Sequence, residues 1–214
     1  AKKDLEMDFK GYQTPAWLSR LRRSLVTAAL VITLAPVGQA PAADLKPLHF
    51  ATVGEMIEDL GDYAAENGTF KLLSTEPLKI QLAPSIVPGD LPENNAREIR
   101  RAALYGVYRT LVHTDADKVT SVAVPREVNI REQTSKVLSK PSLSITVTRA
   151  QALKAAGQFL KVQSAADLVR PEQAGTIQLD NWAPKFEDAY MTDKGQIRLL
   201  EAIKAAGGDL VNNG

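Results

Sequence analysis

The chain has 214 residues, carries 26 Lys or Arg against 25 Asp or Glu, and contains no cysteine. A near-neutral chain without a basic block lacks the concentrated positive charge that nucleic-acid binding needs. The missing cysteine excludes a thiol nucleophile, thiolate metal sites and an acylated cysteine.

The stretch RLRRSLVTAALVITLAPVGQAPAADLK has the order of a secretory signal. Arg20, Arg22 and Arg23 form a basic flank, and an apolar core follows from Leu25 to Val37. Ala40-Pro41-Ala42 then supplies the small residues of a cleavage site. This pattern predicts cleavage after Ala42 and export of the remainder to the bacterial periplasm.

Two alternatives to cleavage stay open for this stretch. The uncharged run from Ser24 to Ala43 is 20 residues long, which nominally crosses a bilayer core of about 30 Å, so a retained inner-membrane anchor is one alternative. A soluble core helix is the other. We therefore expect a signal peptide or signal-anchor over residues 1–42 and a periplasmic domain over 43–214, long enough for one hydrophobic core.

The first elements of this domain are set by capping and turn residues. Thr52-Val53-Gly54-Glu55 has the form of a capping box, and apolar residues at helical spacing predict a helix over 53–66 that stops at Asn67-Gly68. Residues 70–73 and 78–82 read as short strands, followed by a proline-rich irregular connection.

The longest predicted helix runs from Glu93 to His113. Apolar residues recur along it at four-residue steps, so the helix should lie on a sheet. Four arginines are expected largely off that apolar face: Arg97, Arg100, Arg101 and Arg109. Alternation predicts a strand over 119–124, and the polar segment 126–139 reads as a strand with a mobile loop.

The last third of the chain alternates strand and helix patterns. The predicted elements are a strand over 143–147, a second capping box over 148–151 with a helix behind it, a short helix over 164–169, a strand over 176–179 and a helix over 193–206 closed by Gly207-Gly208. The expected class is α+β, with helices packed on a small mixed or antiparallel sheet, or α/β if the strands prove parallel.

Within that part, the sequence ITVTRAQALKAAGQFLKVQSAADLV resembles the βααβ arrangement of LysM peptidoglycan-binding modules. The resemblance covers residues 143–179, and Thr148-Arg149-Ala150 stands where such modules usually open with Gly-Asp-Thr. It implies peptidoglycan as an alternative ligand, without carrying over any ligand residue.

His113-Thr-Asp-Ala-Asp117 is the densest polar cluster. His113, Asp115 and Asp117 are candidate metal ligands or catalytic groups, and His49 is the histidine that could complete the set. The other interpretation is a helix end followed by a turn, because histidine suits a helix C-terminus and aspartate suits turns. We expect neither a metal nor another cofactor.

Two groups of residues are candidates for contact with a partner. Trp182, Phe186 and Tyr190 recur at four-residue steps and form either a partner-binding surface or carbohydrate platform, or a lid packed on the core. Arg97 and Arg101 on the long helix either meet an acidic partner or face solvent.

The sequence also contains no nucleophile elbow, no H-E-x-x-H zinc motif and no glycine-rich phosphate loop. The favoured hypothesis is therefore a non-catalytic envelope protein that serves as an interaction or accessory module in secretion, conjugation or envelope assembly. Peptidoglycan binding and a metal-assisted hydrolase using His113, Asp115 and Asp117 are the alternatives.

Overall fold

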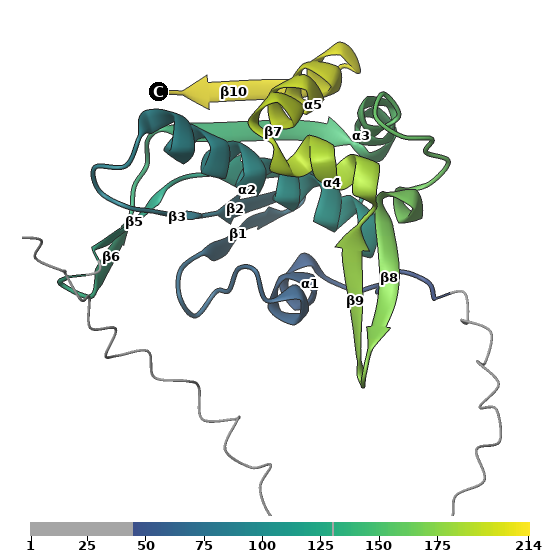
Figure 1. Cartoon of the computed structure of the whole chain (residues 1–214), viewed down its shortest axis with the longest axis horizontal. Helices are drawn as coiled ribbons and strands as arrows, with labels where there is room; N and C mark the ends of the chain where they lie inside the picture. Colours follow the sequence, from purple (N-terminus) through teal and green to yellow (C-terminus); the bar gives the residue numbers. More distant parts are fainter. Residues whose placement is uncertain (1–44, 130) are drawn as a thin grey trace, which may run out of the picture. The chain divides into compact units, whose positions relative to one another are not determined.

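The structure is a computed structural model that describes residues 45–129 and 131–214, and its helices cover one face of a central sheet (Figure 1). The elements, in chain order, are α1 (Val53–Leu60), β1 (Phe70–Thr75), β2 (Leu78–Leu82), β3 (Ser85–Ile86), α2 (Pro92–His113), β4 (Lys118–Ala123), β5 (Arg126–Asn129), β6 (Thr134–Val137), β7 (Ser142–Thr148), α3 (Arg149–Ala156), the 3₁₀ helix η2 (Ala165–Leu168), β8 (Val169–Ala174), β9 (Ile177–Trp182), α4 (Pro184–Met191), α5 (Asp193–Ala205) and β10 (Asp209–Asn213).

The central sheet has the strand order β1-β2-β4-β7-β10. Strands β2 and β4 are parallel, and the other neighbouring pairs are antiparallel. Strands β3, β5 and β6 form a small second sheet, and β8 and β9 form a hairpin. The predicted α+β class with a mixed sheet is thus confirmed.

Buried and half-buried residues alternate along β4 and β7, and the buried ones form the core beneath α2. Val119, Ser121 and Ala123 of β4 are buried, while the residues between them are half-buried on the opposite face. The middle of α2 is buried along its whole circumference because β2, β4 and β7 lie beneath it and α4 and α5 lie beside it. Gly106 permits this approach, since a Cβ there would lie 2.1 Å from Ser121 Oγ.

Two residues, Asp90 and Pro92, explain why helix α2 begins where it does. Pro92 occupies the first helical position, where its missing N–H costs no hydrogen bond. Asp90 Oδ1 accepts hydrogen bonds from Leu91 N at 2.7 Å and from Asn94 Nδ2 at 2.9 Å. The predicted helix over 93–113 therefore agrees with the observed one to within a residue.

The prediction for the first helix is wrong at its C-terminal end. Helix α1 ends at Leu60, and Gly61 adopts a left-handed conformation with φ of 74°, where its N–H caps the Ile57 carbonyl. Glycine populates this conformation without a Cβ penalty, so the helix stops there and does not reach residue 66. Residues 61–69 instead form the connection that places Asp62 and Tyr63 beside α2.

The segment that resembles LysM does not form one βααβ unit. Strand β7 lies in the central sheet between β4 and β10, whereas β8 pairs with β9 in the hairpin. The capping box at its first helix is nevertheless present: Thr148 Oγ1 accepts from Gln151 N, and Gln151 Oε1 accepts from Thr148 N.

The predicted export segment, residues 1–42, lies outside the described residues. Between residues 45 and 214, no helix combines the length and apolarity that a membrane crossing requires.

Candidate functional site

A cavity of about 540 Å³ opens along one side of α2. Four parts of the chain surround it: the connection after α1, the segment from the end of β2 to β3, helix α2 itself, and the segment from the end of β9 through α4. We call it the α2 cavity and define it by six of its lining residues: Tyr63, Arg101, Tyr105, Arg109, Trp182 and Tyr190. Its volume is in the range of pockets that hold small molecules or short peptide segments.

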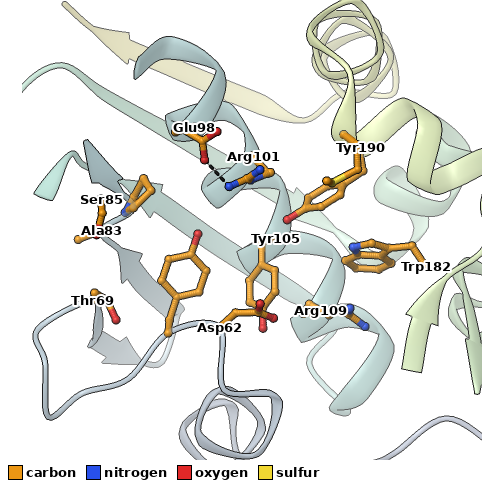
Figure 2. A pocket seen from close by; sticks show the side chains of 13 residues that line it. Asp62, Thr69, Ala83, Ser85, Glu98, Arg101, Tyr105, Arg109, Trp182 and Tyr190 are labelled. Carbon is orange, nitrogen blue, oxygen red and sulfur yellow. Dashed lines mark ion pairs between the residues drawn. The ribbon is translucent and has the colours of Figure 1, made fainter. Parts of the chain in front are cut away.

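Four aromatic rings line the cavity together with charged and small polar side chains (Figure 2). The rings of Tyr63 and Tyr105 meet edge to face with centroids 5.1 Å apart. The rings of Trp182 and Tyr190 are tilted at 5.3 Å. In Figure 2 the Tyr190 hydroxyl is directed toward the Arg101 side of the cavity. These contacts hold the rings in fixed positions, as recognition of a ligand requires.

Burial raises the pKa of the tyrosines in the cavity above the ordinary tyrosine value. It is the main cause for Tyr63, Tyr105 and Tyr190 alike, and for Tyr105 the neighbouring Asp62 carboxylate adds to it. All three therefore stay protonated at neutral pH and can donate hydrogen bonds into the cavity.

No hydrogen bond of ordinary length and angle is found for the Tyr105 hydroxyl among the described residues, although the side chain is only 3% exposed and the Asp62 carboxylate lies beside it. A buried polar group without a partner costs about 1–3 kcal/mol, so such groups are rare in folded proteins.

Arg109 lies at the inner end of the cavity and is only 8% exposed. Its Cζ stacks 3.8 Å from the Trp182 ring centroid, and Nη1 donates to the Asp180 carbonyl at 2.7 Å. Its Nε is buried and has no hydrogen-bond partner among the described residues. The sequence prediction that Arg109 lies off the buried face is therefore wrong, because the β8–β9 hairpin and α4 cover this side of α2 as well.

The other arginines of α2 differ from Arg109 in having carboxylate partners. Arg97 and Arg101 pair with Glu98, and Arg100 pairs with Asp193. No ion pair with a carboxylate of the described chain is found for Arg109. Burial lowers the pKa of Arg109, while the nearby Asp62 and Asp180 carboxylates favour its charged form without direct contact.

Behind Arg109, a buried network joins α2, β9 and the residues before α1. The side chains of His113 and Asp180 are fully buried, with His113 Nδ1 3.6 Å from Asp180 Oδ2. His113 Nδ1 donates to the Leu48 carbonyl at 2.8 Å, which leaves Nε2 to accept from Arg109 Nη1 at 3.3 Å. Asp180 Oδ2 accepts from Leu48 N at 2.6 Å. The network therefore holds the Arg109 guanidinium against the Trp182 ring.

The cluster predicted around His113 is not brought together. Asp115 and Asp117 are almost fully exposed, and Asp117 pairs with Arg149 at 3.8 Å. His49 does approach Asp115, with Nε2 3.1 Å from Oδ1, but at the surface. Within residues 45–129 and 131–214, no group of three His, Asp or Glu side chains is placed to hold a metal ion.

The predicted aromatic residues lie on two elements. Trp182 ends β9 and is 7% exposed, whereas Phe186 and Tyr190 belong to α4 and are 0% and 6% exposed. Trp182 and Tyr190 line the α2 cavity together with Arg101, while Phe186 packs behind them against Tyr108. Asp62, Tyr63, Tyr105 and Asp180 were not predicted as site residues, because nothing local marks them.

A matched pair of tyrosines on α2 tests whether the Tyr105 hydroxyl is unpaired. Tyr105→Phe removes a hydroxyl without a partner, so we expect the free energy of unfolding to stay constant or rise. Tyr108→Phe removes a hydroxyl that donates to the Ala152 carbonyl at 3.3 Å. This change should cost about 0.5–1.5 kcal/mol. Urea denaturation of both variants measures the difference, and equal losses would contradict it.

The buried His113 predicts an acid-sensitive fold. Burial lowers the pKa of His113 below 6.5, and the Arg109 charge and His49 act in the same direction, while the Leu48 carbonyl and Asp180 oppose them. Because the unfolded chain binds the proton more readily, the free energy of unfolding should fall as pH drops below about 6.5.

Unfolding curves between pH 7 and pH 5 measure this effect. The slope that one proton contributes is at most about 1.4 kcal/mol per pH unit. His113→Gln cannot take up that proton, so its stability should change less over the same range. If the two proteins show the same slope, the assignment to His113 is wrong.

The chain matches no protein-family model, no curated protein and no solved structure. A function for this chain therefore has to be argued from the side chains that line the α2 cavity.

Proposed function

We propose that residues 43–214 act in the bacterial envelope as a non-catalytic binding domain, an accessory to secretion, conjugation or envelope assembly, and that the α2 cavity takes a segment of a protein partner. The carrying observation is that one cavity of about 540 Å³ brings together four aromatic rings and two arginines from distant parts of the chain: Tyr63, Tyr105, Trp182, Tyr190, Arg101 and Arg109.

The composition of the cavity favours recognition over covalent chemistry. Its wall offers aromatic faces and tyrosine hydroxyls that stay protonated at neutral pH. Tyrosine, tryptophan and arginine are the residue types that most often anchor a binding partner.

Site-directed photocrosslinking tests the proposed site. A photoreactive phenylalanine analogue in place of Tyr63 should form a discrete adduct with an envelope protein in living cells, and the yield should fall when Tyr105→Phe is added. The matched control places the same analogue at Lys79, which is exposed on β2. An adduct at Lys79 but not at position 63 would overturn the proposed site, and sedimentation with purified peptidoglycan without protein adducts would favour the peptidoglycan alternative.

The location rests on the basic, apolar and small-residue order of Arg20 to Lys46. Cell fractionation followed by N-terminal sequencing should find the protein in the periplasm beginning at Ala43, or intact in the inner membrane if the segment is retained. Recovery of the intact chain from the cytosol would contradict export.

A further inference from the structure

The two edges of the central sheet differ in how well they are protected against pairing with another strand. Strand β1 forms one edge and strand β10 forms the other (Figure 1). A sheet edge presents backbone N–H and C=O groups that no neighbouring strand satisfies. Exposed edges are therefore usually blocked by covering segments, irregular register or charged side chains, lysine above all.

The β1 edge is protected in each of these ways. The Phe70 N–H donates to the Ala64 carbonyl at 3.1 Å, so the connection after α1 covers the beginning of the strand. The pairing with β2 shifts register between Leu72 and Ser74, which makes the edge irregular there. Lys71 is exposed and adds a charge. A strand arriving at this edge would therefore meet an interrupted and charged template.

The β10 edge is regular and, within the part of the chain that the structure describes, uncovered. Its five residues pair with β7 in unbroken register, from Asp209 opposite Thr146 to Asn213 opposite Ser142. Strand β10 contains no lysine, arginine or proline. Apart from the pairing with β7, its backbone makes no hydrogen bond to another described residue. Alternate residues of such a strand direct their N–H and C=O groups away from the neighbour, where one more strand can bind them.

A second copy of β10 complements this edge in charge. Pairing around a twofold axis is antiparallel, and all five residues are paired when Val211 faces Val211 of the second copy. Asp209 then faces Asn213 of the second copy, so the single charged residue of the strand meets an amide and not another carboxylate. Val211 is 44% exposed, and the valine pair covers this apolar surface.

The same register also brings an apolar side chain toward a small cavity. This cavity has a volume of about 280 Å³, lies where α2 and α5 meet the start of β7 and the end of β10, and includes Ile99, Leu143, Leu200 and Asn212 in its lining. Asn212 pairs with the buried Leu143, so both side chains lie on the helix-covered face of the sheet. Leu210 of the second copy lies opposite Asn212 on that face, and thus beside the apolar lining.

We infer that the protein forms a twofold dimer in which two β10 strands pair antiparallel, joining two five-stranded sheets into one continuous sheet. This interface goes beyond the proposed function, because the residues that define the α2 cavity lie outside β7 and β10. Each copy of the dimer therefore keeps its own α2 cavity, and failure of the dimer would leave the proposed function untouched.

Single cysteines test the register directly, because the chain contains no cysteine of its own. Val211→Cys in the full chain should give a disulfide-linked dimer under mild oxidation, since directly opposed residues of antiparallel strands have Cβ atoms about 4.5–5.5 Å apart. Leu72→Cys on the β1 edge is the matched control, because Leu72 is 43% exposed and Val211 is 44% exposed. The absence of a linked dimer at position 211, or faster linkage at position 72, would overturn the inference.

A charge exchange at position 211 tests the same contact without cysteine. Val211→Asp and Val211→Lys each place like charges opposite one another, so each variant alone should dimerise at least about tenfold more weakly than the unaltered chain. An equimolar mixture should regain a dimer containing one chain of each kind, because opposite charges then face each other. Circular dichroism should show both variants folded, since position 211 is exposed at the edge of the sheet.

Sedimentation velocity over about a hundredfold range of protein concentration measures these equilibria. The unaltered chain should pass from monomer to dimer with increasing concentration. A chain that stays monomeric would contradict the inference, as would open-ended polymers, which indicate pairing of β10 with β1 of another copy. Undiminished dimerisation of both charge variants, or a mixture that does not associate, would show that the contact between copies lies elsewhere.

Discussion

Replacing Phe186 by alanine should lower the free energy of unfolding by about 3–5 kcal/mol, the range for a fully buried aromatic residue. The Phe186 side chain is 0% exposed. Its ring meets Tyr108 edge to face at 4.7 Å and lies 5.1 Å from the Trp182 ring. The change leaves a cavity between α2 and α4 and removes the support behind one wall of the α2 cavity.

Denaturant unfolding monitored by circular dichroism measures this loss. Lys185→Ala on the same helix is the control, since Lys185 is exposed and its truncation should change stability by no more than about 0.5 kcal/mol. A loss below about 1 kcal/mol for Phe186→Ala would mean that α4 does not pack on α2 as described.

Gly195→Ala should destabilise the protein by about 1–3 kcal/mol or more, through overpacking between α4 and α5. A Cβ at this position would lie 2.5 Å from the Ala189 carbonyl oxygen and 2.6 Å from the Ala189 Cα. These are backbone atoms, so the clash cannot be relieved by rotating a side chain. The same Cβ would also meet Thr192 Oγ1, which accepts the hydrogen bond that caps α5.

The chain provides a matched glycine for comparison. Gly54 lies in α1, which Thr52 caps in the same way as Thr192 caps α5. The closest atom to a Cβ added at Gly54 is Thr52 Oγ1, at 3.8 Å. Gly54→Ala should therefore leave stability unchanged or raise it by up to about 1 kcal/mol, because alanine favours helix. Thermal denaturation of both variants gives the comparison, and similar melting temperatures would refute the close packing of α4 and α5.

Sequence patterns predict those helices and strands in which apolar residues repeat regularly over most of the element's length. Helix α2 repeats its apolar row over several turns, and β4 and β7 alternate through their whole length. Strand β10 was missed because it is a short, mostly polar segment that becomes a strand only by pairing with β7. Helix α4 was missed for a related reason, since it has eight residues and begins at Pro184 without a side-chain cap.

The site was predictable only in part, because its geometry depends on contacts between distant segments. Trp182, Tyr190 and Arg101 were recognisable as residue types that bind partners, but their neighbours Tyr63 and Tyr105 come from other elements. The burial of Arg109 depends on the hairpin and α4 folding over α2, which no local pattern encodes. His113 was considered as a metal ligand or catalytic group, but its partners in the structure are Leu48 and Asp180, 65 and 67 positions away along the chain.

Residues 46–50 run across this same network before α1 begins, and their position has a mechanical consequence. Leu48 is bonded to both His113 and Asp180, Lys46 accepts from Gln178, and Phe50 N donates to the His113 carbonyl. A pulling force applied at residue 45 would therefore load β9 and the C-terminal end of α2 before it reached α1. Because Arg109 bonds to His113 and to the Asp180 carbonyl, tension on this end of the domain and occupancy of the α2 cavity act on one connected set of side chains.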